Sequence, residues 1–421
     1  MEKKNNLMRF MALTSLGFSY GIIYLLPYMK AVFYDQMMKA TGFTNEQLGL
    51  MVTAYTIGTT ITYLPGGWVA DKFKPKNILT VCLVLNGFLC FAFMLVCTNF
   101  TLSMGIWFAS ALCGGFAFWP AMLKSVRLMG TREEQGRIYG VFEAINGFAS
   151  LIGSWMMAGV LLVFTDLIAG FQGAVVTMGV LCWLAAIFIW LSFKEHITYN
   201  EDALEEKEVI TAKDFFRAIT MPTVWVPSLL LFGGITMYGT LSYLTPYMEN
   251  KVGITGALLV AMPFMAAFRE YGCRIGGIGG GLMADKVFKS SARWQVVAHL
   301  ITALLIFSFV IIPTNAPILA LAVMFLYGFA VYANRVTTYS MLSELRVPPK
   351  VTATAVAIMT LVGYSPDFFI HAMYGNWLDT YGNDGFDKIF TYAGTVGLCC
   401  IPVAMVGVWL SNKARKQAVQ A

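Results

Sequence analysis

Charged residues are scarce in this sequence. Asp, Glu, Lys and Arg make up 12% of the 421 residues, and 3 histidines are present, whereas a soluble domain carries about 25% charged residues. Hydrophobic residues make up 58%, and the mean hydropathy is +0.67. No water-soluble core can bury that much apolar surface, so the composition excludes an ordinary soluble protein.

The residue patterns that enzymes need are also missing. The sequence has no phosphate-binding Gly-rich loop, no cluster of metal-ligating residues and no nucleophile beside a convincing base. Its 8 cysteines all fall within apolar runs, so they indicate neither a disulfide framework nor a metal site. The net charge of +6 is spread over short loops and is not a nucleic-acid footprint. We therefore expect no enzymatic activity, no cofactor and no nucleic-acid partner.

Long apolar runs are what the sequence does contain. A helix needs roughly 20 apolar residues to cross a bilayer. The sequence predicts spans near residues 8–29, 47–69, 77–98, 102–126, 138–163, 173–193, 222–247, 256–283, 294–312, 317–343, 352–377 and 388–410. The predicted fold is all-α and polytopic, with six spans in residues 1–194, a charged cytoplasmic linker in residues 195–218 and six spans in residues 219–421.

Short phrases occur once in each half at nearly equal offsets. Gly66–Lys72 (GGWVADK) returns as Gly280–Lys286 (GGLMADK), and Tyr24–Met29 (YLLPYM) returns as Tyr243–Met248 (YLTPYM). A weaker echo pairs GFAFW at residue 115 with GFAVY at residue 328. Equal offsets indicate two duplicated halves that run in the same direction, an organisation typical of transporters.

Lys and Arg gather in alternate loops. The loops on one predicted side, together with both chain ends, hold most of the 29 basic residues, and the opposite side keeps Lys30, Lys39, Lys251 and Lys388. Because positive charge is retained in the cytoplasm, we expect a multi-pass protein of the bacterial inner membrane with both termini cytoplasmic. We expect it to act as a monomer in the lipid bilayer.

The repeated phrase between spans two and three resembles the signature loop of the major facilitator superfamily. The matching residues are Gly67, Asp71, Lys72 and Lys76, and the second half repeats them as Gly281, Asp285 and Lys286. Lys74 departs from the pattern, because the family usually has glycine there. The resemblance implies a two-bundle fold, alternating access and a cytoplasmic gate that includes these residues. The alternative interpretation is that these charged residues only set the topology of the protein in the membrane.

Within that family, the chain resembles the bacterial sugar-phosphate and organic-anion permeases. Span five, which includes Glu143 and Asn146, has no proline and so lacks the Gly-Pro-rich signature of drug/proton antiporters. The chain also lacks the arginines that organophosphate antiporters place in spans one and seven. The resemblance therefore implies a small organic anion but does not name it.

Charged residues at membrane depth are the candidate substrate contacts. Placing one there costs at least ~2.5 kcal/mol on insertion scales, so a functional role is the default interpretation. We predict that Arg269 and Arg335 hold the anion, because a guanidinium is a two-pronged donor for a carboxylate or phosphate. Glu270 and Arg274 are four residues apart and are predicted to pair on one helical face. A purely structural network of Arg269, Glu270 and Arg274 is the alternative.

Polar and aromatic neighbours complete the predicted site. Asn334 adjoins Arg335 in span ten, and Tyr20 and Tyr24 recur four residues apart in span one. Phenol and amide groups at such positions can hydrogen-bond the hydroxyls of a polar solute while their flanks pack.

Proton coupling is assigned to the carboxylates and the histidine of the membrane segments. Asp367 and His371 are four apart after Pro366, so they can share a proton on one face. Glu143 and Glu270 are alternative proton carriers, and Asp367 can instead be a fixed counter-ion to an arginine. The sequence thus predicts a proton-coupled symporter of a sugar acid, carboxylate or sugar phosphate. Efflux of a lipophilic or drug-like compound is the alternative, and a non-transporting sensor would bind solute without flux.

Overall fold

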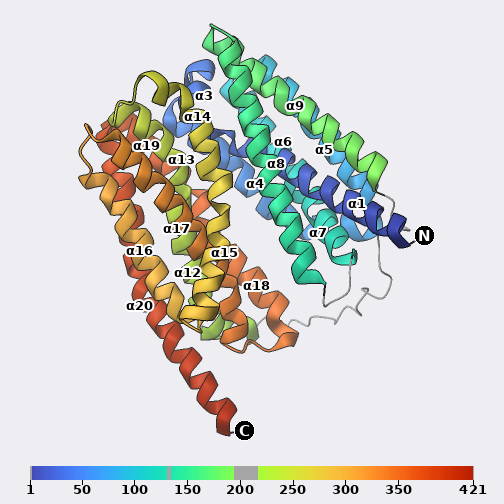
Figure 1. The fold of residues 1–421 in the computed structure, drawn as a ribbon, viewed down its shortest axis with the longest axis vertical. Coiled ribbons are helices and arrows are strands. Elements are labelled where there is room, and N and C mark those ends of the chain that lie inside the picture. Colours follow the sequence, from blue (N-terminus) through green and yellow to red (C-terminus); the bar gives the residue numbers. More distant parts are fainter. Residues whose placement is uncertain (1, 130–133, 194–216, 421) are drawn as a thin grey trace. The chain divides into compact units, whose positions relative to one another are not determined.

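Helices make up the regular structure of the protein. The computed structural model describes residues 2–129, 134–193 and 217–420, and none of these residues forms a strand (Figure 1). This confirms the all-α prediction. The predicted linker at residues 195–218 lies almost wholly outside the described residues.

The first half begins with a bent span. Helix α1 (Glu2–Ile23) is followed by α2 (Leu25–Tyr28) and the turn η1 (Met29–Ala31), with a bend of 40° between the two parts. Helix α3 (Tyr34–Thr41) follows and ends at Gly42, whose φ of 72° suits glycine. The other elements of this half are α4 (Asn45–Lys72), α5 (Pro75–Val96), α6 (Phe100–Ala111), η2 (Leu112–Phe118), α7 (Trp119–Leu128), α8 (Gln135–Val163) and α9 (Leu167–Ser192).

Polar caps start several of these helices. Thr44 and Gln47 form a capping box at the start of α4, because each side chain accepts a hydrogen bond from the other residue's backbone N–H, at 3.2 and 3.0 Å. Asn99 at the start of α6 and Asp166 at the start of α9 each accept one hydrogen bond from a backbone N–H of the first turn. Such caps satisfy N–H groups that would otherwise lack partners at the membrane boundary.

The second half has the same plan with more interruptions. Its elements are α12 (Pro222–Gly239), α13 (Leu241–Pro246), η4 (Tyr247–Lys251), α14 (Gly256–Tyr271), η5 (Gly272–Ile275), α15 (Gly276–Leu282), η6 (Met283–Val287), α16 (Ser291–Ile311), α17 (Pro317–Glu344), α18 (Pro349–Gly363), η7 (Ser365–Phe368), α19 (Ile370–Tyr381) and α20 (Asp384–Gln420). The YLLPYM phrase forms α2 and η1, and its copy forms α13 and η4. Both copies therefore follow a break in the first long helix of their half.

Most of the predicted spans are long apolar helices. Among the described residues, eight helices are long and apolar enough to cross a membrane, or nine if the bent α1–α2 pair is one span. Helix α4, with 28 residues, stands at the predicted second span. The predicted eighth and eleventh spans are interrupted, by η5 at Gly272 and by η7 at Pro366, where a glycine and a proline disfavour a continuous α-helix.

The chain divides into two compact units. One comprises Met1–Glu206 with Pro263–Gly272, and the other comprises Lys207–Met262 with Cys273–Ala421. The C-terminal part of α14, from Pro263, therefore groups with the first half of the chain. Buried aliphatic and aromatic residues from α1, α5, α7 and α9 form the core of the first unit, and α12, α16, α17, α18 and α20 supply that of the second.

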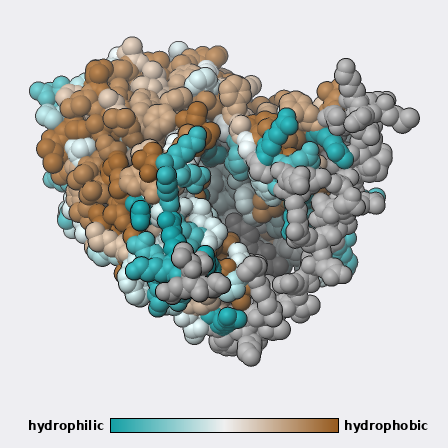
Figure 2. Space-filling view, turned by 60° about the horizontal axis from the view of Figure 1, so that its bottom comes forward, coloured by the Kyte–Doolittle hydropathy of each residue, from teal (hydrophilic) through white to brown (hydrophobic). Residues whose placement is uncertain are grey.

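The surface is apolar over wide areas. Leu95, Val163 and Ile311 expose 77 to 79% of their surface, and many other large apolar side chains are exposed. Figure 2 shows brown, hydrophobic residues over the flank on its left, while hydrophilic residues gather on the end that is turned forward. A surface of this kind requires lipid around it.

The repeated phrases mark equivalent contacts inside each unit. A Cβ added to Gly66 would overlap the carbonyl oxygen of Phe116, so α4 lies directly against η2. In the second unit, a Cβ on Gly276 or Gly280 would overlap the carbonyl oxygens of Phe329 and Ala333, so α15 lies equally close to α17. Glycine permits this close helix approach in both halves.

Candidate functional site

Arg335 lies in α17 within an aromatic enclosure. Its Nη2 atom donates a hydrogen bond of 2.7 Å to the hydroxyl of Tyr364, and its guanidinium carbon lies 4.7 Å from the Tyr238 ring centre and 5.5 Å from that of Tyr364. Tyr332 packs edge-on against Tyr238 at 5.8 Å. These aromatic faces attract the cation and also shield it from lipid.

Most of the donor capacity of Arg335 is unused. A guanidinium has five N–H donors, and the bond to Tyr364 is its one hydrogen bond within the described residues. No carboxylate of that part of the chain lies within ion-pair distance of it. Arg335 as a whole residue is half-buried. A cation held this way at membrane depth can bind an anion.

Asp367 and His371 lie at the break in span eleven. Asp367 belongs to η7 and His371 to the first turn of α19, and their Oδ1 and Nε2 atoms are 3.7 Å apart. The carboxylate is 17% exposed, and its Oδ1 has no hydrogen-bond partner among the described residues. The Tyr243 hydroxyl donates to the carbonyl oxygen of His371 at 2.8 Å and so anchors the start of α19. Asp367 is also close enough to Arg335 to interact with it electrostatically.

Asn334 faces the interior of the second unit. The residue is 1% exposed, and neither atom of its side-chain amide has a hydrogen-bond partner in the described chain. Its backbone carbonyl accepts a 2.8 Å bond from Gln295, which also bonds Thr337 and Thr338. Asn334 thus belongs to a buried polar cluster between α16 and α17.

Sequence reasoning named Asn334 but missed the other members of that cluster. Gln295 and His299 both lie in the predicted ninth span and are fully buried. The His299 ring nitrogens lie 3.0 and 3.3 Å from the carbonyl oxygens of Gln295 and Leu230. A glutamine and a histidine four residues apart inside an apolar run were the available signal.

Arg269 is fully buried in the first unit. Its Nη2 atom donates a 2.6 Å hydrogen bond to the carbonyl oxygen of Ala31, at the end of the bent first span. Glu270 beside it is 3% exposed. Helix α14 ends at Tyr271, so Glu270 lies in this helix and Arg274 in the turn η5 that follows it. Arg269 and Arg335 belong to different units.

Tyr20 of α1 and Tyr24, the N-cap of α2, belong to a row of packed aromatic rings. Tyr20 stacks on Phe142 with ring centres 5.4 Å apart and lies 5.3 Å from Trp119. Tyr24 contacts Tyr20 at 5.2 Å, and its hydroxyl donates to the Gly114 carbonyl oxygen at 3.1 Å. Both tyrosines are half-buried. Their rings therefore join α1 to α8, η2 and α7.

Glu143 lies on an exposed face of α8. Its Oε2 atom accepts a 3.0 Å hydrogen bond from the side-chain amide of Asn146, one turn further along. Asn146 itself is 2% exposed and accepts from Ser150 through its carbonyl oxygen. The Glu143 side chain is therefore exposed, and its carboxylate is held by the hydrogen bond from Asn146.

The first signature segment, which contains Gly67, Asp71, Lys72 and Lys76, covers the end of α4 and the start of α5. Lys124 of α7 donates a 3.0 Å hydrogen bond to the carbonyl oxygen of Ala70, so it caps the end of α4. Lys72 lies over the Trp68 ring at 4.9 Å, and Lys76 over the Trp190 ring at 4.3 Å. The side chain of Asp71 lies outside the described part. Gly67 has open space where a Cβ would stand.

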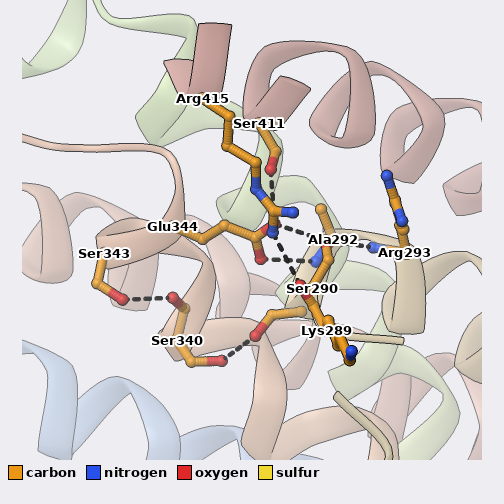
Figure 3. A network of polar contacts seen from close by, with 10 residues as sticks. Lys289, Ser290, Ala292, Arg293, Ser340, Ser343, Glu344, Ser411 and Arg415 are labelled. Atoms are coloured by element: carbon orange, nitrogen blue, oxygen red, sulfur yellow. Dashed lines mark hydrogen bonds and ion pairs between the residues drawn. The ribbon is translucent and has the colours of Figure 1, made fainter. Parts of the chain in front are cut away.

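The second signature segment covers the end of α15, which contains Gly281, and the π-helix η6, which contains Asp285 and Lys286. Gly281 has open space at its Cβ position, and Asp285 and Lys286 are exposed. Figure 3 shows the polar network that holds the following loop: Glu344, at the end of α17, accepts from Ser290 Oγ at 2.5 Å and from Ser411 Oγ at 2.6 Å.

Two further donors complete this network. The backbone N–H of Ala292 donates to Glu344 at 3.1 Å, and Arg415 reaches both Glu344, at 3.3 Å, and the carbonyl oxygen of Lys289, at 2.8 Å (Figure 3). Glu344 therefore ties α16, α17 and α20 together where the loop after the second signature segment ends.

Comparison with known proteins settles the family. The model of the Major Facilitator Superfamily matches residues 10–371. The chain belongs to this superfamily. Membership makes it a membrane transporter and not an enzyme, in agreement with the resemblance seen in the signature loops.

Related superfamily members are bacterial. The chain is 26% identical to the inner membrane proteins YqcE and YihN of Escherichia coli strain K12, covering 89% of both chains in the first case and 93% in the second. It is also 26% identical to the probable sulfoacetate transporter SauU of Cupriavidus necator, over 68% of this chain and 67% of that one. These relatives indicate an integral protein of the inner membrane.

Solved superfamily structures show the same fold. The nucleoside transporter NupG matches with a TM-score of 0.68 at 13% identity, over 95% of this chain and 99% of that one. A bacterial homologue of the human lysosomal transporter Spinster matches with a TM-score of 0.68 at 13% identity, over 96% and 97%. At such identities the likeness establishes the fold alone.

Proposed function

We propose that this protein is a proton-coupled secondary transporter that moves a small organic anion across the bacterial inner membrane. The observation that carries this proposal is Arg335, a half-buried residue whose guanidinium lies against the rings of Tyr238 and Tyr364 and donates one hydrogen bond within the described chain. Leaving such a cation unpaired at membrane depth is costly, so a ligand that pairs with it is expected.

The surroundings of Arg335 favour a singly charged, polar solute. Asp367 is a carboxylate of this unit that interacts electrostatically with Arg335. Tyrosine rings beside the cation offer flat apolar surface and hydroxyls, which suits the ring and hydroxyl groups of a sugar acid. A carboxylate or sugar phosphate of similar size is the same class of ligand.

Arg269 receives a different role in this proposal. Its guanidinium bonds the Ala31 carbonyl oxygen and is fully buried, so we assign it to the packing of α14 against the first span. Asn334 is likewise assigned to the interior of its unit. Tyr20 of α1 and Tyr24 at the start of α2 are assigned to solute contact in the first unit.

Coupling is assigned to the carboxylate at the break in span eleven. Asp367 lies 3.7 Å from His371, so a proton can be held between them. Glu143, which is exposed and bonded to Asn146, is the second candidate. By family resemblance, the signature segments that contain Asp71 and Asp285 gate the cytoplasmic side.

Uptake into proteoliposomes tests this function. Purified protein would be reconstituted and given radiolabelled D-glucuronate, sulfoacetate, glycerol 3-phosphate and neutral D-glucose, with and without an inward proton gradient. We expect one of the anions to accumulate only with the gradient, while glucose does not. Accumulation of none of the anions, or binding without flux, would contradict the proposal, and extrusion of a lipophilic dye would support an efflux transporter instead.

A further inference from the structure

The hydroxyl of Tyr364 occupies the place that an anion oxygen needs. It accepts the one hydrogen bond that Arg335 makes within the described residues, at 2.7 Å. A phenol oxygen is a neutral acceptor, whereas a carboxylate or phosphate oxygen is charged and forms a stronger bond to a guanidinium. An anion that approaches this edge of Arg335 therefore competes with Tyr364 and has the energetic advantage.

Tyr364 is also the residue at which span eleven breaks. Helix α18 ends at Gly363, and Tyr364 is both its C-cap and the residue that starts η7. The Tyr364 N–H donates to the Thr360 carbonyl oxygen at 2.9 Å, and the Tyr364 carbonyl oxygen accepts from the N–H of Asp367 at 3.1 Å. The backbone of Tyr364 thus bonds to both sides of the break.

The end of α18 itself has little freedom to move. A Cβ on Gly363 would overlap the side chain of Leu231, so the end of α18 lies directly against α12. Movement at the break is therefore expected on the far side of Tyr364, in η7 and the start of α19. That side carries Asp367 and His371.

We propose, on the basis that Arg335 is the anion contact, that Tyr364 is a positioning residue whose hydroxyl stands in for the anion. When the anion binds, it displaces this hydroxyl from Arg335. The freed side chain loosens the turn η7, and the occupancy of the anion site is thereby passed to the segment that holds Asp367. One side chain links solute binding to the coupling carboxylate.

The test compares Tyr364→Phe with wild type in two measurements. D-Glucuronate and sulfoacetate are the probes, and affinity is measured by equilibrium binding to purified protein. Tyr364→Phe keeps the ring beside Arg335 and removes the competing hydroxyl, so the probe that binds wild type should bind the variant about 3- to 10-fold more tightly, the effect of losing one competing hydrogen bond. Tyr381→Phe, which removes an exposed hydroxyl at the end of α19, is the matched control and should bind as wild type does.

Hydrogen exchange of the backbone amides of residues 365–370 supplies the second measurement. In wild type, the probe should raise exchange in this segment. In Tyr364→Phe, exchange should already be high without the probe and should change little when it is added. This pattern separates displacement from a merely structural role of the ring, which would leave the probe response intact.

The outcomes distinguish this inference from the function on which it rests. Binding by wild type, with equal or weaker binding by Tyr364→Phe and no probe effect on exchange, would overturn the role of Tyr364 alone. Failure of both probes to bind wild type would overturn the anion site at Arg335 and the inference with it. If Tyr364→Phe does not fold, the exchange response of wild type decides, and a flat response would overturn the inference.

Discussion

At the scale of the residue, Glu344 and Arg335 of the second unit differ in how far the protein satisfies their charges. Glu344 accepts hydrogen bonds from two serines, a backbone N–H and Arg415, so its charge is satisfied within the protein. Arg335 donates once within the described chain and is surrounded by aromatic rings. A satisfied charge holds helices together, whereas an unsatisfied one at membrane depth indicates a ligand.

Removing the Asp367 carboxylate should separate proton coupling from solute exchange. If Asp367 carries the coupled proton, Asp367→Asn abolishes accumulation against a gradient but retains counterflow, because exchange of bound solute needs no net proton movement. Uptake and counterflow in the same proteoliposomes measure both. Loss of counterflow as well would indicate that Asp367 is the fixed partner of Arg335. Unchanged accumulation would contradict both roles of Asp367, and Glu143 would then be the candidate proton carrier.

Replacing Arg269 should affect stability more than solute affinity. Arg269→Met removes the charged donor to the Ala31 carbonyl oxygen, and losing a hydrogen bond from a charged group costs about 1.5 to 3 kcal/mol. We expect a lower melting temperature in detergent and unchanged solute affinity in the protein that remains folded. An unchanged melting temperature together with a loss of solute affinity would contradict this role and identify Arg269 as a solute-binding residue.

The sequence identified which charges lie at membrane depth but not which of them are satisfied. The partner of Arg269 is a backbone carbonyl 238 positions away, and no side-chain pattern reveals it. The enclosure of Arg335 draws on Tyr238 and Tyr364 from two other spans. Spacing along one helix cannot show such contacts, since they depend on how separate helices pack.

At the scale of the element, the paired glycines show which residues set helix approach. Gly66 and Gly280, the first of each pair, lie against neighbouring backbone, while Gly67 and Gly281 face open space. The family pattern assigned the signature glycines to Gly67 and Gly281. The backbone contact therefore falls on the residue before each of them.

This difference gives a matched pair of substitutions in each half. Gly66→Ala and Gly280→Ala should force α4 from η2 and α15 from α17, and should lower the yield of folded protein and its melting temperature. Gly67→Ala and Gly281→Ala should leave stability equal or up to about 1 kcal/mol higher, because alanine favours a helix interior. Equal losses at both members of a pair would contradict the packing described for that half.

Breaks in the helices were harder to predict than their existence. Long apolar runs predicted α5, α8, α9, α16, α17 and α20 as spans. The sequence showed Pro366, and a kink was expected there, but it did not show that the break is a 3-10 turn, η7, with Asp367 inside it. The η5 turn after Tyr271 had only its glycines as a signal.

At the scale of the whole molecule, the fold could be predicted from the internal duplication and the apolar composition of the sequence. Two halves with equal offsets and an apolar composition led to the facilitator fold, which the family match and the solved structures confirm. The orientation in the membrane rests on the distribution of Lys and Arg alone.

Single cysteines test that orientation in a variant without the native cysteines. Lys413→Cys, near the end of α20, should react with an impermeant thiol reagent only after the membrane is opened. Asp384→Cys, at the start of α20, should react in intact cells. Both positions are exposed, so access is set by the side of the membrane. The reverse pattern would invert the topology.

The effect of Arg335 on anion uptake tests the central claim most directly. Arg335→Lys keeps the charge and loses the planar two-pronged donor, and Arg335→Gln loses both. For the anion that wild type accumulates, we predict uptake affinity lower by about 10- to 150-fold in Arg335→Gln, from the loss of about 1.5 to 3 kcal/mol, with a smaller loss in Arg335→Lys. The exposed Arg293→Lys should transport as wild type does. Uptake affinity near that of wild type in both Arg335 variants would contradict the account.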